Sequence, residues 1–138
     1  MKRTRNLLTA LLLAVILLGA VNADAVGIPA TDPGVVPYYT VISSLDGTLE
    51  ISRSGRASCR ASVDVSSLSY NVTLTCDLCK DGTVIKSWTA SGKGSVSLDK
   101  SWYVTSGSDY QVVASATVYN STGNYIDSGT AYSDVVSY

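Results

Sequence analysis

Three cysteines are the residues of this chain best suited to chemistry. Cys59 stands alone, whereas Cys76 and Cys79 belong to a Cys-Asp-Leu-Cys sequence. A CxxC pair can carry thiol–disulfide exchange when a helix N-terminus lowers the pKa of the attacking thiol. Here the pair runs into the turn sequence at 80–82, Lys-Asp-Gly, and no helix is expected beside it. A thiol-redox enzyme is therefore the least favoured of three functional hypotheses.

Other catalytic groups are scarce. Histidine is absent, and Glu50 is the single glutamate. Serine and cysteine nucleophiles usually need a histidine base, so most hydrolase mechanisms are excluded. The aspartates occupy scattered turn and surface positions and offer no pair suited to glycoside hydrolysis. A structural zinc would need a carboxylate as its fourth ligand, because the chain has 3 cysteines. We expect no enzyme, no catalytic residue, no metal site and no cofactor.

The cysteines are better explained as disulfide candidates, because the export signal described below leads to an oxidising exterior. Cys59 and Cys76 fall on the apolar faces of two expected strands, at similar distances from a turn at 67–68. We predict a disulfide between them, worth about 3 kcal/mol in the chain-entropy model. Cys79, three residues after Cys76, falls on the opposite, polar face of the expected strand and lies beside a turn. There we expect an exposed thiol that is free, pairs with another chain or, after a shift of register, competes for Cys59.

The elements that position these residues are β-strands. Apolar and polar residues alternate with a period of two, which is typical of half-buried strands. The alternation is strongest over residues 57–65, 70–78 and 110–118. Further strands are expected at 39–44, 48–53, 83–89, 95–104 and 130–137, separated by glycine-containing turns such as Asp46-Gly47. Many short strands with regular turn signals predict a β-sandwich or barrel.

The position of one tyrosine narrows the predicted fold to one class of β-sandwich. Tyr110 follows the turn at Gly107 and begins a strongly alternating penultimate strand. This is the position of the tyrosine corner in immunoglobulin-like and fibronectin-like sandwiches. We predict an all-β sandwich of that class, with seven to eight antiparallel strands, preceded by a signal-peptide helix.

The N-terminus has the pattern of an export signal. Basic residues at 2, 3 and 5 precede an apolar run over 7–21, and small residues provide cleavage positions after Ala23 and Ala25. The apolar run is shorter than the roughly 20 residues that cross a bilayer. We place the cleavage after Ala23, which predicts a signal peptide at 1–23, a proline-rich extended linker at 24–37 and a folded domain at 38–138. The mature protein is expected to be secreted.

Charge narrows the range of partners. Cleavage after Ala23 removes three of the 10 basic residues and none of the 11 acidic residues, which leaves a net charge of −4. Binding to nucleic acid or anionic lipid depends on clustered lysine and arginine. We therefore expect no nucleic-acid partner, and no membrane association after signal cleavage.

Aromatic residues suggest where a ligand would bind. Trp88 and Trp102 share faces with apolar neighbours, so we assign both to the core rather than to sugar-stacking platforms. Tyrosines are better placed for exposure, in part beside an expected loop at 119–128. The tyrosines assigned to a possible binding surface are Tyr38, Tyr39, Tyr103, Tyr119 and Tyr125.

Four segments resemble a known group of proteins. They are Val36-Pro37-Tyr38-Tyr39-Thr40-Val41-Ile42, Gly55-Arg56-Ala57-Ser58-Cys59, Val84-Ile85-Lys86-Ser87-Trp88 and Gly92-Lys93-Gly94-Ser95. Together they resemble an uncharacterised family of small exported proteins from Gram-positive gut bacteria. The resemblance implies secretion and an immunoglobulin-like or fibronectin-like sandwich. It carries no activity and no site residues.

The sequence thus predicts a secreted, non-enzymatic module that binds an extracellular glycan, cell wall or protein, or that associates with the cell envelope. The alternative is a small secreted effector or bacteriocin-like toxin, for which stability outside the cell matters and no active site is needed.

Overall fold

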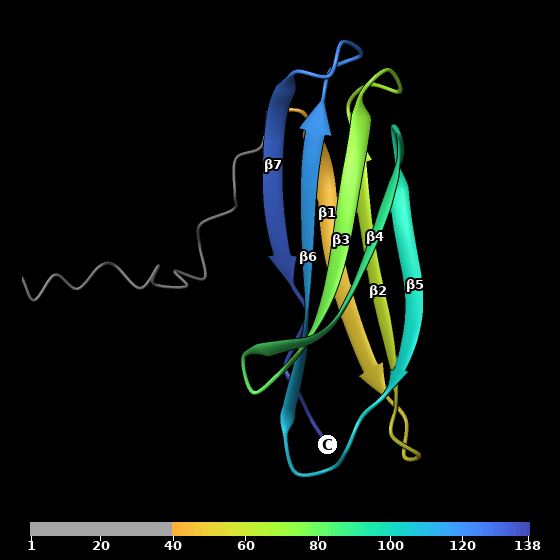
Figure 1. Ribbon diagram of the computed structural model, residues 1–138, viewed down its shortest axis with the longest axis vertical. Coiled ribbons are helices and arrows are strands. Elements are labelled where there is room, and N and C mark those ends of the chain that lie inside the picture. The colour runs from red at the N-terminus through yellow and green to blue at the C-terminus, as the bar shows by residue number, and fades with distance from the viewer. Residues whose placement is uncertain (1–39) are drawn as a thin grey trace, which may run out of the picture. The chain divides into compact units, whose positions relative to one another are not determined.

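A computed structural model describes residues 40–138, which form an all-β sandwich of two antiparallel sheets (Figure 1). The strands are β1 (Ile42–Ile51), β2 (Arg56–Val65), β3 (Asn71–Lys80), β4 (Thr83–Lys93), β5 (Val96–Tyr103), β6 (Asp109–Tyr119), β7 (Tyr125–Tyr132) and β8 (Val136–Ser137). One sheet has the order β1-β2-β5. The other has the order β4-β3-β6-β7, with β8 paired to β6. The predicted immunoglobulin-like or fibronectin-like fold class is confirmed. The predicted signal peptide and linker lie outside the described residues.

The alternating pattern sorts side chains as expected. Val72 and Leu74 of β3 are buried; the apolar positions of β6 lie beside them in the same sheet, and those of β2 face them from the other sheet. Each such aliphatic side chain contributes about 1.5–3 kcal/mol by leaving water. Residues 40–138 contain no helix long and apolar enough to cross a membrane.

The tyrosine corner is present. Tyr110 is buried at the start of β6, and its hydroxyl donates a hydrogen bond of 2.6 Å to the carbonyl oxygen of Thr105. The corner joins the β5–β6 connection to the core strand β6. The assignment of Tyr110 from its glycine-turn context is therefore correct.

The predicted turn at Asp46-Gly47 is wrong. Gly47 lies within the continuous strand β1 and pairs with Ala61 of β2. A Cβ at position 47 would stand 3.3 Å from the Cβ of Ala114 and 3.4 Å from Cγ1 of Val112. Glycine is present because the two sheets approach closely at this point, rather than because the chain turns.

The last predicted strand, at 130–137, is also divided differently. β7 begins at Tyr125 and ends at Tyr132, and the short β8 follows after a break. Consequently the β6–β7 loop is restricted to residues 120–124. Asn120 closes this loop, because its Oδ1 accepts hydrogen bonds from the amides of Thr122 and Asn124 at 3.0 and 2.9 Å.

An aspartate on β7 holds the beginning of β1. Oδ2 of Asp127 accepts hydrogen bonds from the amides of Thr40, Val41 and Ile42 at 2.8, 2.9 and 3.4 Å. Desolvation alone would raise the pKa of Asp127, but the amide hydrogen bonds from these residues and Ser128 outweigh it, so that the pKa lies below its usual value. The carboxylate therefore links the two sheets at their edge.

Candidate functional site

Two of the predicted tyrosines come together at one end of the five-stranded sheet. Tyr119 ends β6 and pairs with Tyr125, the first residue of β7. Their rings meet edge to face with centroids 6.5 Å apart. Tyr125 is 62% exposed, and its hydroxyl lies 3.0 Å from Oγ of Ser128. The pair forms an aromatic platform with polar edges on the outer face of the sheet.

Beside this pair, rows of hydroxyl side chains cross the sheet. The cross-strand pairing of β4, β3, β6 and β7 aligns outward-facing positions into rows. One row contains Ser91, Thr73, Thr117 and Ser128, and the next contains Thr89, Thr75, Ser115 and Thr130. We call these two rows the hydroxyl face.

The hydroxyl face is organised by hydrogen bonds between its own side chains. The hydroxyls of Thr73 and Ser91 are 3.1 Å apart, and those of Thr75 and Thr89 are 3.2 Å apart. Each hydroxyl has one donor and two acceptor positions, so a paired hydroxyl keeps further capacity for a ligand. Tyr132, which is 65% exposed, lies one row beyond the hydroxyl face, opposite Val113.

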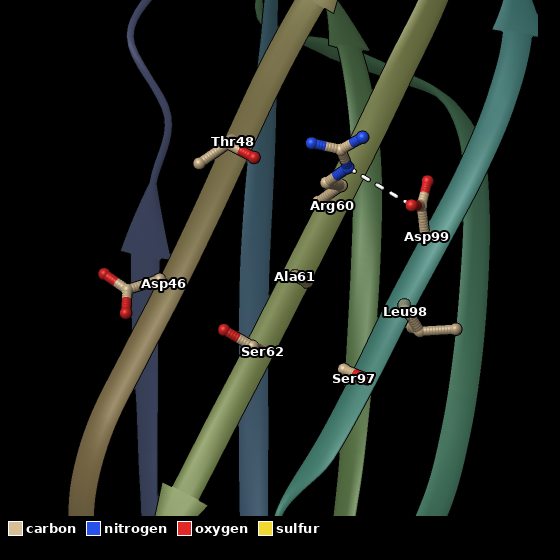
Figure 2. A pocket seen from close by; sticks show the side chains of 8 residues that line it. All are labelled: Asp46, Thr48, Arg60, Ala61, Ser62, Ser97, Leu98 and Asp99. Carbon is tan, nitrogen blue, oxygen red and sulfur yellow. Dashed lines mark hydrogen bonds and ion pairs between the residues drawn. The ribbon is translucent and has the colours of Figure 1, made fainter.

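A shallow concavity of about 350 Å³ lies on the outer face of the other sheet (Figure 2). It is lined by residues of β1, β2 and β5: Asp46, Thr48, Arg60, Ala61, Ser62, Ser97, Leu98 and Asp99. Nε of Arg60 and Oδ2 of Asp99 form an ion pair at 3.2 Å. Both side chains are well exposed, so the pair adds little to stability.

This second face is charged, whereas the hydroxyl face is not. Arg56 donates a hydrogen bond to Ser101 at 3.0 Å, along the same outer surface as Arg60. Asp64 accepts hydrogen bonds from Ser95 and Ser44, which lower its pKa. The side chains of the concavity can hydrogen-bond to a polar ligand, but the surface is too open to enclose one.

The predicted disulfide is not present. Cys59 and Cys76 are free, buried thiols. They belong to different layers, because β2 is in the three-stranded sheet and β3 is in the five-stranded sheet. Equal spacing from a turn aligns two residues only when their strands pair in one sheet, and β2 does not pair with β3. The prediction treated β2 and β3 as neighbours across a turn, but the chain between them crosses from one sheet to the other.

Burial makes these thiols unreactive. It raises the pKa of Cys59 to about 12, and the Cys76 thiol adds to this shift. Burial and then the charge of Asp77 raise the pKa of Cys76 to about 11.

Cys79 was expected to be exposed, but it is buried. Cys79 pairs with Gln111, which alternates with the buried positions of β6, and it is not part of the core cluster that contains Leu78. It lies on β3 between β4 and β6, where the register with β4 is irregular. Burial, followed by the charge of Asp77, raises the pKa of the Cys79 thiol. A redox CxxC motif needs a lowered pKa instead. Among residues 40–138, no cluster of three or more cysteine or carboxylate side chains could hold a metal ion.

The two tryptophans have different environments. Trp88 is partly buried and packs against the core, as predicted. Trp102 is 42% exposed, so its assignment to the core is wrong. Nζ of Lys86 lies 4.5 Å from the centre of the Trp102 ring. β5 is an edge strand, so the sheet does not cover both sides of this ring.

The remaining tyrosines do not join the Tyr119–Tyr125 pair. Tyr103 is 72% exposed, but it ends β5 in the other sheet. Tyr38 and Tyr39 lie outside the described residues. Tyr132 and the hydroxyl face were missed by the sequence analysis. Their signal was the repeated serine and threonine at the polar positions of β3, β4 and β6, which alternation alone treats as ordinary surface.

No known family model matches the chain, and no curated protein matches it. The resemblance to exported proteins of Gram-positive bacteria thus stays a prediction.

Proposed function

We propose that the mature chain is a secreted, non-enzymatic binding or envelope-associated module that acts through the outer face of its five-stranded sheet. The observation that carries this proposal is the Tyr119–Tyr125 pair, with Tyr125 exposed and Tyr119 half-buried, beside the hydroxyl face. Aromatic rings provide contact area at low entropic cost, and hydroxyls provide adaptable hydrogen bonds. Together these groups suit recognition of a ligand rather than its chemical conversion.

Two further features support the proposal. The signal sequence at 1–23 favours export of the chain. The thiols at Cys59, Cys76 and Cys79 are buried, with pKa values raised by burial. A thiol with a raised pKa is a poor nucleophile at neutral pH, because the thiolate is the reactive form.

The proposal is tested by retention on extracellular material. The secreted protein is incubated with isolated bacterial cell walls and with intact cells, and the bound fraction is measured after washing. We expect retention that is lost in the double variant Tyr119→Ala/Tyr125→Ala. The matched control is Tyr103→Ala, because Tyr103 is an exposed tyrosine, as Tyr125 is, but lies on the other sheet.

Equal retention of the double variant and the parent would contradict the assigned surface. Killing of neighbouring strains by the purified protein, without retention on any surface, would instead identify the small secreted effector that the sequence offers as the alternative.

A further inference from the structure

A strip of the outer sheet face runs between Tyr125 and Tyr132. Both tyrosines belong to β7 and are exposed, and the hydroxyl face lies between them. On β6, their pairing partners are Tyr119 and Val113. These partners are six residues apart, which corresponds to about 20 Å at the rise of an antiparallel strand. The strip therefore has an aromatic ring at each end and hydroxyls along its length.

Resting on the proposed function, we infer that this strip binds a neutral, linear polysaccharide that runs along β6 and β7. A sugar ring presents an apolar C–H face and a rim of hydroxyls. The C–H face packs against an aromatic ring. The rim exchanges hydrogen bonds with serine and threonine, whose hydroxyls both donate and accept, as those of the sugar do.

Charge favours a neutral polymer over an anionic one. Asp77 and Lys93 are the charged members of the rows that contain the tyrosines and the hydroxyl face, and they lie in different rows. The arginines at 56 and 60 are on the outer face of the other sheet. An anionic polymer would require clustered cations on the strip itself.

Composition favours a polysaccharide over a protein partner. Serine is depleted at protein interfaces, and serine and threonine are under-represented among the residues that dominate protein binding energy. The two middle rows of the strip consist of these residue types across four strands of the sheet. A protein partner would leave many of these hydroxyls desolvated without compensating hydrogen bonds.

The test uses affinity electrophoresis of the full secreted protein. Native gels contain either hydroxyethyl cellulose or carboxymethyl cellulose, which share a backbone but differ in charge, and a parallel series contains xylan or mannan. We expect retardation by at least one neutral polymer, and weaker retardation by the carboxymethylated polymer than by its neutral counterpart.

The variants are Tyr125→Ala, Tyr132→Ala and Thr117→Val. Each tyrosine variant should weaken binding about tenfold, as expected when an aromatic contact of about 1.4 kcal/mol is lost. Thr117→Val keeps the shape of the side chain and removes one hydroxyl, so we expect a smaller, several-fold loss. Tyr103→Ala is the matched control and should bind as the parent does. Because the substituted side chains are on the surface, thermal unfolding should show that every variant folds.

The inference is overturned if no neutral polymer retards the protein, if the anionic polymer is preferred, or if Tyr125→Ala and Tyr132→Ala bind as the parent does. Retention of the protein on cell walls without binding to any polysaccharide would contradict this inference but not the proposed function. If the protein bound neither cell walls nor polysaccharides, both would be contradicted.

Discussion

The hydroxyl of Tyr110 donates a 2.6 Å hydrogen bond to the carbonyl oxygen of Thr105, five residues earlier in the chain. Tyr110 is buried at the start of β6, the strand that pairs with β3, β7 and β8. The bond therefore fixes the β5–β6 connection against the strand that carries half of the proposed binding strip.

Removal of this hydroxyl should destabilise the domain. Tyr110→Phe leaves the Thr105 carbonyl without its partner, and we expect a loss of about 1–2 kcal/mol in the free energy of unfolding. Urea denaturation followed by tryptophan fluorescence measures the change. Tyr103→Phe, at an exposed position, should stay within about 0.5 kcal/mol of the parent. Equal effects of the two substitutions would argue against a structural role for the corner.

Asp127 should make stability depend on pH. Its pKa in the folded state lies below its usual value, so its contribution is present above the unfolded pKa of about 3.9 and is lost as pH falls through the folded pKa. We expect Asp127→Asn to cost about 1 kcal/mol at pH 7, because the carboxylate is only partly buried and an amide oxygen still accepts hydrogen bonds. Urea midpoints measured from pH 7 down to pH 2 should converge for the parent and the variant.

Asp99→Asn serves as the comparison for this pH series. Its ion pair with Arg60 is exposed, and we expect a change below about 0.5 kcal/mol at pH 7. If the Asp127→Asn deficit were constant down to pH 2, the amide hydrogen bonds would not depend on the charge of the carboxylate.

Gly47 should not tolerate a larger side chain. Gly47→Val would push methyl groups toward Ala114 and Val112, where even a Cβ would stand at 3.3 and 3.4 Å. Overpacking of this kind costs about 1–3 kcal/mol, and the better strand propensity of valine offsets part of it. Chemical denaturation checks the prediction, with Thr48→Val on the opposite face of β1 as a neutral control. A more stable Gly47→Val protein would mean that the sheets can separate locally.

The thiols of Cys59 and Cys76 should be unreactive in the folded protein. Burial raises the pKa of Cys59 and Cys76 to about 12 and about 11, so a thiol reagent at pH 8 should not react with either while the chain is folded. In guanidinium without reductant, the full complement of 3 cysteines should titrate. Titration of a single thiol would reveal a disulfide and contradict the structure.

Local sequence was enough to predict the strands and their inward faces. The alternation over β2, β3 and β6 determines which side chains leave water, since successive residues of a strand point to opposite faces. It also located the tyrosine corner at Tyr110, because a glycine turn and a buried tyrosine lie close together in the chain. Exposure of Tyr103 and Tyr125 followed from the same reasoning.

Only the tertiary structure decided which strands are neighbours. Alternation is a property of one strand, whereas sheet membership and register depend on contacts between residues far apart in sequence. That is why Cys59 and Cys76 were paired across a turn although their strands lie in different sheets, and why Gly47 was assigned to a turn although it accommodates β6. The hydroxyl face arises in the same way, because its rows exist only once β4, β3, β6 and β7 lie side by side in register.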